Sequence, residues 1–142
     1  MSMSCAPYIS FPGNASEAFP YYHELFGGEL SLMTYDQFPS TDDFPFDPPH
    51  GSVAHATLEA PGITLTGGDA MGESLPQLRN DVYSFLLGFD TEDEARAFLD
   101  KVTGSGGQMA MPFEIAPWGD RYGQVHDRFG IRWDVVVPGT GE

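Results

Sequence analysis

Residues 7–30 read PYISFPGNASEAFPYYHELFGGEL, and this stretch contains the pattern that decides the fold. A short aromatic and β-branched segment at 7–11 predicts a strand, which a Pro-Gly pair then ends. Asn14 and Glu17 have the spacing of a helix-capping box, and apolar side chains follow at helical spacing. The glycine pair 27–28 predicts the end of this helix, after which a second strand begins.

The same order of elements returns in the second half of the chain. A strand predicted over 83–89 is followed by a capping box from Thr91 to Glu94 and a second helical stripe, which ends in the glycine-rich stretch 104–107. Thr91 lies 77 residues after Asn14, so the two helix starts are related by a fixed period. A repeated period of this kind indicates two copies of one structural module.

The repeat predicts an α+β fold made of two tandem βαβββ modules, at residues 6–68 and 81–137. Neither module alone could bury both its helix and its sheet face, so we expect them to pair into one larger sheet within a single domain, 1–142. Further strands are predicted at 29–35, 51–60, 62–66, 108–113, 121–127 and 131–137.

Charge is the most unusual property of the composition. Six basic residues stand against 21 acidic ones, which gives a formal net charge of −15. Binding to nucleic acid or to an anionic membrane surface requires clustered cations, and the basic residues here are scattered, so both partners are excluded. An acidic field keeps the protein soluble and favours cationic ligands.

The chain carries one cysteine, Cys5, which excludes an intrachain disulfide and a cysteine-based zinc site. No apolar run reaches the ~18 residues of a membrane-spanning helix. The first residues have neither the basic region nor the apolar region of a secretory signal. We therefore expect a cytoplasmic protein.

Two stretches resemble a known family. Residues 7–30 resemble the opening of the vicinal oxygen chelate superfamily, the glyoxalase and bleomycin-resistance fold. The stretch WGDRYGQVHDRFGIRW at 118–133 is similar to the PhnB-like branch of that superfamily, and the pair His55-Ala56 also fits it. The resemblance spans residues 6–137. It implies a cupped, mixed and mostly antiparallel sheet around a cavity, and a homodimer.

The resemblance also implies where a metal would bind. Enzymes of this superfamily hold a divalent metal on ligands from the first and fourth strands of each module. The corresponding positions here fall near Pro7, Thr64, Ser84 and Asp134. Only Asp134 carries a metal-competent group, so we expect no metal and no cofactor at this place. A divalent metal remains the alternative, because a shifted register brings Asp69 or Glu59 near the fourth strand.

The four histidines offer a second constellation, although no two of them share a local ligand spacing. His55 and His126 occupy comparable strands of the two modules, so a pseudo-twofold axis could bring them together. Each is either a half-buried strand histidine bonded to its neighbours or an acid/base group with a pKa near working pH. The catalytic candidates are His55, Asp134 and His126. His55 is the better placed of the two histidines, because its strand lies beside the predicted cavity.

The candidate ligand-binding residues are Ser84, Thr64, Trp118, Arg132 and Phe44. Arg132 and Asp134 share one face of the last strand, because strand side chains alternate, and they could form a charged floor under a polar ligand. Trp118 lies in the WGDRYG segment, which either lines the cavity mouth or forms an ordered hairpin with an ion pair from Asp120 to Arg121. Phe44 lies in an acidic and aromatic loop, which is either a lid or a dimer contact.

Three functions from different classes remain open. The first is a metal-free binder of a small molecule, with a cationic or aromatic compound as the expected ligand. The second is a superfamily enzyme of the lyase, isomerase or oxygenase type with an altered metal or acid/base site. The third is a non-catalytic protein that acts through its dimer surface. An apolar cavity with convergent polar groups would favour the first two.

Overall fold

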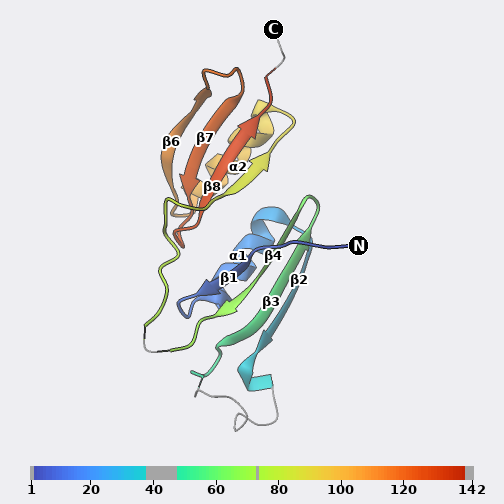
Figure 1. Ribbon diagram of the computed structural model, residues 1–142, viewed down its shortest axis with the longest axis vertical. Helices are drawn as coiled ribbons and strands as arrows, with labels where there is room; N and C mark the ends of the chain where they lie inside the picture. The colour runs from blue at the N-terminus through green and yellow to red at the C-terminus, as the bar shows by residue number, and fades with distance from the viewer. Residues whose placement is uncertain (1, 38–47, 73, 140–142) are drawn as a thin grey trace. The chain divides into compact units, whose positions relative to one another are not determined.

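A computed structural model describes residues 2–37, 48–72 and 74–139. The chain divides into two compact units, Met1–Gln77 and Leu78–Glu142, and each contains one helix and one four-stranded sheet (Figure 1). The first unit contains β1 (Tyr8–Phe11), α1 (Ala15–Phe26), β2 (Glu29–Thr34), a 3₁₀ turn (Tyr35–Gln37), β3 (Val53–Ala60) and β4 (Ile63–Asp69). The second contains β5 (Phe85–Gly88), α2 (Glu92–Gly104), β6 (Gln108–Ile115), β7 (Arg121–His126) and β8 (Arg132–Val137).

The two sheets have the same topology. Their strand orders are β1-β4-β3-β2 and β5-β8-β7-β6, with one parallel pair in each sheet and antiparallel pairs elsewhere. The α+β class and the βαβββ order predicted from the repeat are therefore confirmed in both halves. The pairing of the two modules around a cavity stays a prediction.

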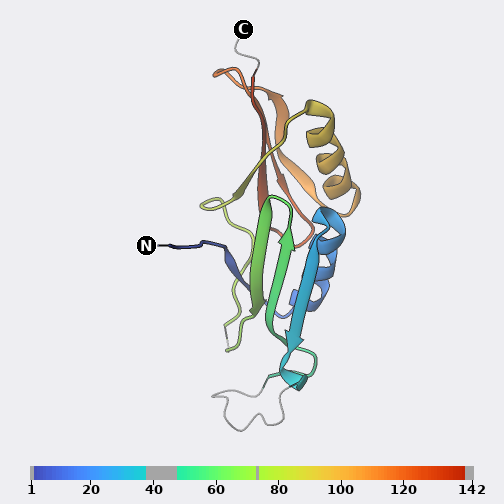
Figure 2. The same cartoon turned by 90° about the vertical axis from the view of Figure 1, so that its right-hand side faces the viewer.

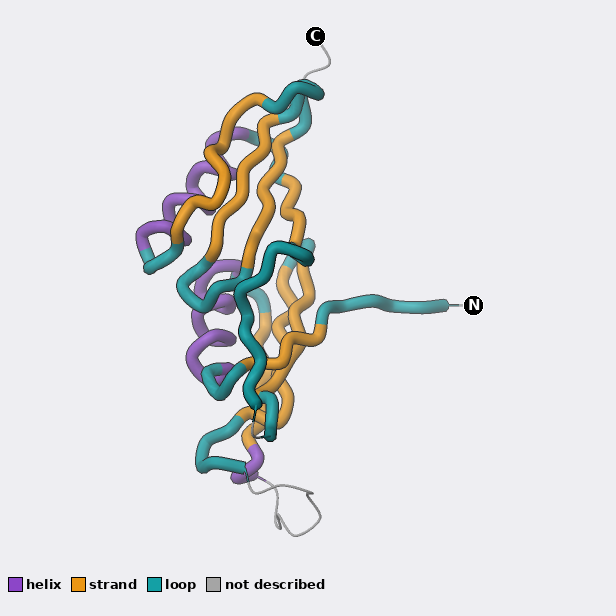
Figure 3. Tube along the Cα trace, turned by 60° about the vertical axis from the view of Figure 1, so that its left-hand side comes forward, coloured by secondary structure: helices purple, strands orange, loops and turns teal. Residues whose placement is uncertain are grey.

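Each helix packs on one face of the sheet in its own unit, as the edge-on views show (Figures 2 and 3). In the second unit the ring of Trp133 is fully buried on this face, 6.5 Å from the Phe98 ring of α2. In the first unit Phe11 and Phe19 contact each other in the same way. We call the opposite side of each sheet, which its own helix does not cover, the open face.

The two helices begin differently, although their sequences predict the same cap. At α2 the Thr91 hydroxyl oxygen accepts from the Glu94 amide at 3.2 Å, which confirms the predicted capping interaction. At α1 the prediction is wrong, because the Asn14 side chain caps no amide. Asp69, from the end of β4, accepts from the Ala15 amide at 2.9 Å instead. A carboxylate from a distant strand thus takes the place of the local cap.

A buried carboxylate shapes the hairpin that joins β7 to β8. Asp127 accepts from the amides of Phe129 and Ile131 at 2.8 and 3.1 Å, and from the indole nitrogen of Trp133 at 2.9 Å. Gly130 takes a positive φ of 100°, which glycine adopts at low cost. These bonds close the turn and link it to the core.

The edge strand β6 is irregular. Its pairing with β7 shifts register between Met109 and Met111 and again between Met111 and Glu114. The backbone of Phe113 comes so close to Gly123 on β7 that a Cβ added there would lie 2.9 Å from the Phe113 Cα. A glycine at this position is therefore what allows β6 to fold over β7.

Among the described residues, neither helix is long and apolar enough to cross a membrane.

We expect Gly123→Ala to lower the free energy of unfolding by about 1–3 kcal/mol, because overpacking forces the backbone of β6 away. Gly88→Ala on β5 is the matched control, since its added Cβ would meet only a side-chain methyl at 4.0 Å. Urea unfolding of both variants checks this expectation. Equal stabilities of the two variants would contradict it.

We expect Asp127→Asn to lower the free energy of unfolding by about 1–3 kcal/mol, because an amide cannot accept at both oxygen positions and leaves a buried donor unpaired. The matched control is Asp90→Asn, at an exposed position of the same unit. Thermal unfolding compares the two variants. A control-like melting temperature for Asp127→Asn would show that the turn does not depend on this carboxylate.

Candidate functional site

A cluster of polar side chains occupies the open face of the second sheet. It consists of Ser84, Tyr122, Gln124, Arg132 and Asp134, and we call it the polar cluster. The antiparallel register of β7 and β8 creates it, since Gln124 pairs with Asp134 and His126 pairs with Arg132. Residues two apart on each strand then share this face.

The ion pair between Arg132 and Asp134 is the centre of the polar cluster. The Arg132 Nε donates to Asp134 Oδ1 at 2.9 Å, and its Nη2 reaches the other carboxylate oxygen at 3.3 Å. The same Nη2 lies 3.3 Å from the hydroxyl oxygen of Ser84, just before β5. The Arg132 and Asp134 side chains are only 17% and 9% exposed, so solvent screens the pair weakly.

Tyr122 and Gln124 complete the hydrogen-bond chain. The Tyr122 hydroxyl donates to Asp134 Oδ2 at 2.5 Å and accepts from the Gln124 side-chain nitrogen at 3.0 Å. Burial raises the pKa of Tyr122, and its hydrogen bond to Asp134 raises it further. The phenol therefore stays protonated at neutral pH and remains a donor to the carboxylate.

His126 lies at the end of β7, beside the polar cluster. Its residue is 6% exposed, and its Nε2 is buried without a hydrogen-bond partner among the described residues. Burial lowers the pKa of His126 below its ordinary value of 6.5, and the positive charge of Arg79 lowers it further. The imidazole is therefore neutral at pH 7, as a proton acceptor must be.

The open face of the first sheet carries exposed side chains, unlike the nearly buried ion pair on the second sheet. His55 is exposed there, stacks on the Tyr8 ring at 5.8 Å and has its Nε2 3.1 Å from the Thr57 hydroxyl. Thr64 is exposed on the same face. His55 and His126 belong to separate units, so their meeting across a pseudo-twofold axis stays a prediction.

The WGDRYG segment forms a turn with one exposed aromatic. Trp118 is 66% exposed, and its ring lies edge-on to the Tyr122 ring at 6.0 Å. Arg121 pairs with Glu92 at the start of α2 at 3.2 Å, and Asp120 accepts from the amide of Gly139, so each has a partner other than its sequence neighbour. Phe44 lies outside the described residues.

The side chains at the four positions implied for a metal fit a transition-metal ion poorly. Pro7 contributes only its backbone carbonyl, which accepts from Thr66, and Thr64 has a side chain that transition metals bind poorly. Ser84 and Asp134 do come together, but the Arg132 guanidinium lies against both of them. Among the described residues, no three His, Cys, Asp or Glu side chains gather closely enough to hold a metal ion.

The shifted-register alternative does not fit a metal either. Both carboxylate oxygens of Asp69 are used inside the first unit, since Oδ1 accepts from Ala15 and Oδ2 from Val53 at 2.8 Å. Glu59 is exposed on β3, opposite Glu29 and Thr64 in the register, and neither neighbour adds a histidine. The donors present thus do not match the His and Glu set that the superfamily uses.

Gln124 is the member of the polar cluster that sequence reasoning missed. The sequence feature that could have revealed Gln124 is the short connection between β7 and β8. A turn at 127–131 pairs residue 124 with residue 134. A register derived from that turn would have placed Gln124 beside Asp134.

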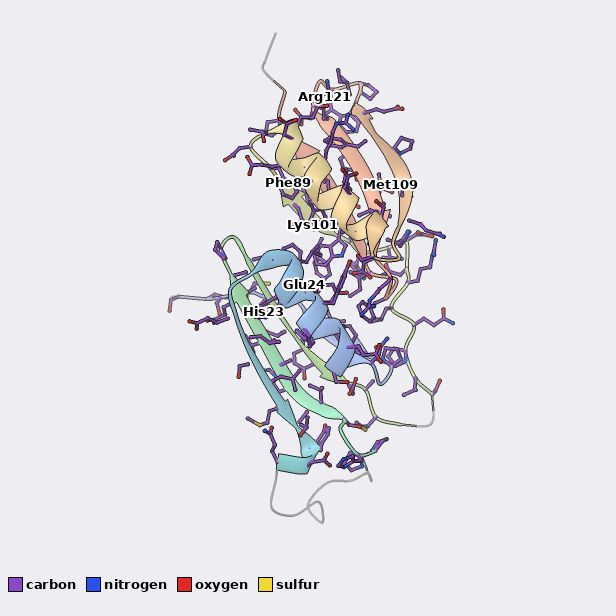
Figure 4. The ribbon with its side chains drawn as sticks, turned by 180° about the vertical axis from the view of Figure 1, so that it is seen from behind. His23, Glu24, Phe89, Lys101, Met109 and Arg121 are labelled. Atoms are coloured by element: carbon purple, nitrogen blue, oxygen red, sulfur yellow. The ribbon has the colours of Figure 1, made fainter. Side chains whose placement is uncertain are left out.

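A second concave feature lies on the helix side of the same sheet. A groove of about 500 Å³ runs between α2 and β6, on the side where Figure 4 labels Lys101 and Met109. Its lining consists of Arg96, Leu99, Asp100, Thr103, Met109, Pro112 and Phe113. The groove is open, and the Arg96 guanidinium covers the Phe113 ring at 5.1 Å. It holds no convergent set of polar groups comparable with the polar cluster.

Comparisons with known proteins place the chain in a family. Residues 7–135 match the Glyoxalase/Bleomycin resistance protein/Dioxygenase superfamily, and the chain belongs to it. Protein YjdN of Escherichia coli (strain K12) is 29% identical over 145 residues, which covers 95% of each chain. The superfamily resemblance inferred from the sequence is therefore confirmed.

Solved structures share the fold. Protein PA1353 from Pseudomonas aeruginosa matches with a TM-score of 0.79 and 28% identity, over 97% of this chain and 99% of that one. The PhnB protein from Bacillus cereus matches with a TM-score of 0.72 and 22% identity, over 96% and 100% of the two chains. A PhnB protein is thus among the structures to which this chain is similar in fold.

The lowered pKa of His126 predicts a pH-dependent stability. The unfolded chain binds a proton near pH 6.5 and the folded chain resists it, so the free energy of unfolding falls as pH falls below that value. His126→Gln should remove this loss, which is at most about 1.4 kcal/mol per pH unit for one proton. Urea unfolding between about pH 5 and pH 7 measures it, with exposed His55→Gln as the control. Parallel curves for wild type and His126→Gln would contradict the assignment.

Proposed function

We propose that this superfamily member binds a small molecule on the open face of its second sheet, at the polar cluster, without a metal. The observation that carries the proposal is that both carboxylate oxygens of Asp134 already accept hydrogen bonds within the protein. Asp134 is the one metal-competent group among the four implied positions, and Arg132 and Tyr122 already occupy both of its carboxylate oxygens. A metal would have to displace a nearly buried guanidinium, and only one carboxylate would hold it.

The polar cluster has the features of a binding site for an organic ligand. Its charges cancel, its hydrogen bonds hold the side chains in place, and hydrophobic Leu86 and aromatic Trp118 lie exposed beside it. Preorganised polar groups next to apolar surface provide both orientation and affinity for a small molecule. The support is local to the second unit and does not depend on the placement of the first.

Elemental analysis of protein produced without a His-tag tests the metal half of this proposal. We expect substoichiometric metal, with no gain after incubation with nickel, zinc, manganese or ferrous ion. Asp134→Asn should leave the metal content unchanged. About one metal per chain, lost in this variant, would overturn the proposal and favour a metalloenzyme.

A thermal-shift screen of small molecules tests the binding half. A true ligand should raise the melting temperature, because binding to the folded state alone stabilises it. Tyr122→Phe should weaken that ligand, since it removes the hydroxyl that links Asp134 to Gln124. Tyr83→Phe is the matched control at an 80% exposed position. A saturable ligand that raises the melting temperature of Tyr122→Phe as much as that of the wild type would show that the binding site lies elsewhere.

One observation favours an enzyme as the second candidate. His126 is buried and neutral and lies across from Arg132 in the register, so it could act as a general base on a ligand held at the polar cluster. A lyase or isomerase type of reaction needs such a base. The third hypothesis is that the protein acts through a dimer surface. It depends on loop aromatics that include Phe44, which lies outside the described residues, and it stays a prediction.

A further inference from the structure

We infer that the ligand of the polar cluster carries a carboxylate, which accepts hydrogen bonds from Nη1 of Arg132, from Ser84 and from His126. The inference rests on the proposed function and names the chemical class of its ligand. It replaces the cationic ligand expected from net charge with an anionic one.

The guanidinium of Arg132 has two edges, and Asp134 uses only one of them. Nε and Nη2 face the Asp134 carboxylate, whereas Nη1 makes no hydrogen bond within the described part of the chain. A planar guanidinium donates in a fork that matches a carboxylate at either edge. Ser84 accepts from Nη2 at the second edge, so Nη1 is the donor that remains there for one oxygen of a ligand carboxylate, while Asp134 keeps the side chain in position.

Ser84 lies at this second edge of the guanidinium. Its oxygen is 3.3 Å from Arg132 Nη2 and accepts from it, so its own hydrogen is directed elsewhere. No other hydrogen bond uses that hydrogen within the described residues. Arg132 Nη1 and the Ser84 hydroxyl thus offer two neighbouring donors without a protein partner among the described residues, and one carboxylate could accept from both.

His126 supplies an independent indication of a ligand. Its Nε2 is buried without a partner in the part of the chain that the structure describes, and a buried polar atom of this kind costs free energy unless something pairs with it. It lies opposite Arg132 in the register of β7 and β8, on the same face. A neutral imidazole with its proton on Nε2 is therefore a third donor without a partner among the described residues, on the same face as Arg132.

Local charge outweighs net charge at this site. The −15 of the whole chain is spread over its length, and salt screens charges beyond roughly 8–10 Å at physiological ionic strength. Within the polar cluster the Asp134 charge is already neutralised by Arg132, whereas Arg132 Nη1 and the Ser84 hydroxyl hydrogen have no partner among the described residues. A cationic group would have to compete with Arg132 for the Asp134 carboxylate.

A series of aromatic probes that differ in charge tests the inference. Benzoate, benzamide and benzylammonium have one ring in common and differ in charge, so ¹⁵N NMR titration of each reports which charge the site prefers. We expect benzoate to bind most tightly and to shift the Arg132 Nε resonance, with benzamide at least tenfold weaker, since hydrogen bonds to charged groups are the stronger ones.

Two variants keep the fold while removing the donors. Ser84→Ala leaves the ion pair in place and should weaken benzoate about three- to tenfold, with Ser74→Ala at an exposed loop position as the matched control. The double variant Arg132→Met with Asp134→Leu removes the pair without leaving a buried charge or changing the net charge, and it should abolish benzoate binding. Far-UV circular dichroism checks that both are folded.

Three outcomes would overturn the inference and leave the proposed function standing. They are tighter binding of benzylammonium than of benzoate, unchanged benzoate binding in the double variant, and screening hits at the polar cluster with no response to benzoate. Failure of every screened compound to bind would instead overturn the proposed function itself.

Discussion

The carboxylate of Asp127 is the interaction on which the polar cluster depends. It holds the turn between β7 and β8 through two amides and the Trp133 indole, so it fixes which residues of the two strands face each other. Strand side chains alternate, and a slip of one residue would move Asp134 to the helix side and Trp133 to the open face. Core and site are therefore set by the same turn.

The repeat made the fold predictable because its signals are local. Helix periodicity, a threonine cap and glycine helix ends act within a few residues of chain, and both βαβββ units follow from them. The cap of α1 was not predictable in the same way. Its acceptor, Asp69, is 54 residues away from the Ala15 amide, and only the pairing of β1 with β4 brings them together.

The candidate site divides along the same line. Arg132 and Asp134 share one face because side chains alternate along a strand, so the sequence alone was enough to predict their proximity. Gln124 joins the polar cluster through cross-strand register, and the same register places the candidate His126 opposite Arg132; both depend on turn geometry and not on composition. Net charge alone does not indicate the carboxylate ligand that we infer, because a sum over the chain does not show which donors of the polar cluster lack a partner.

The irregular edge of the second sheet has a consequence for association. A regular edge strand presents a row of free amides and carbonyls to which another chain can add a strand. On β6 two register shifts and Pro112, which lacks an amide hydrogen, interrupt that row. Strand addition is thus discouraged at β6, and two copies of this chain that joined sheet to sheet would have to do so along another edge.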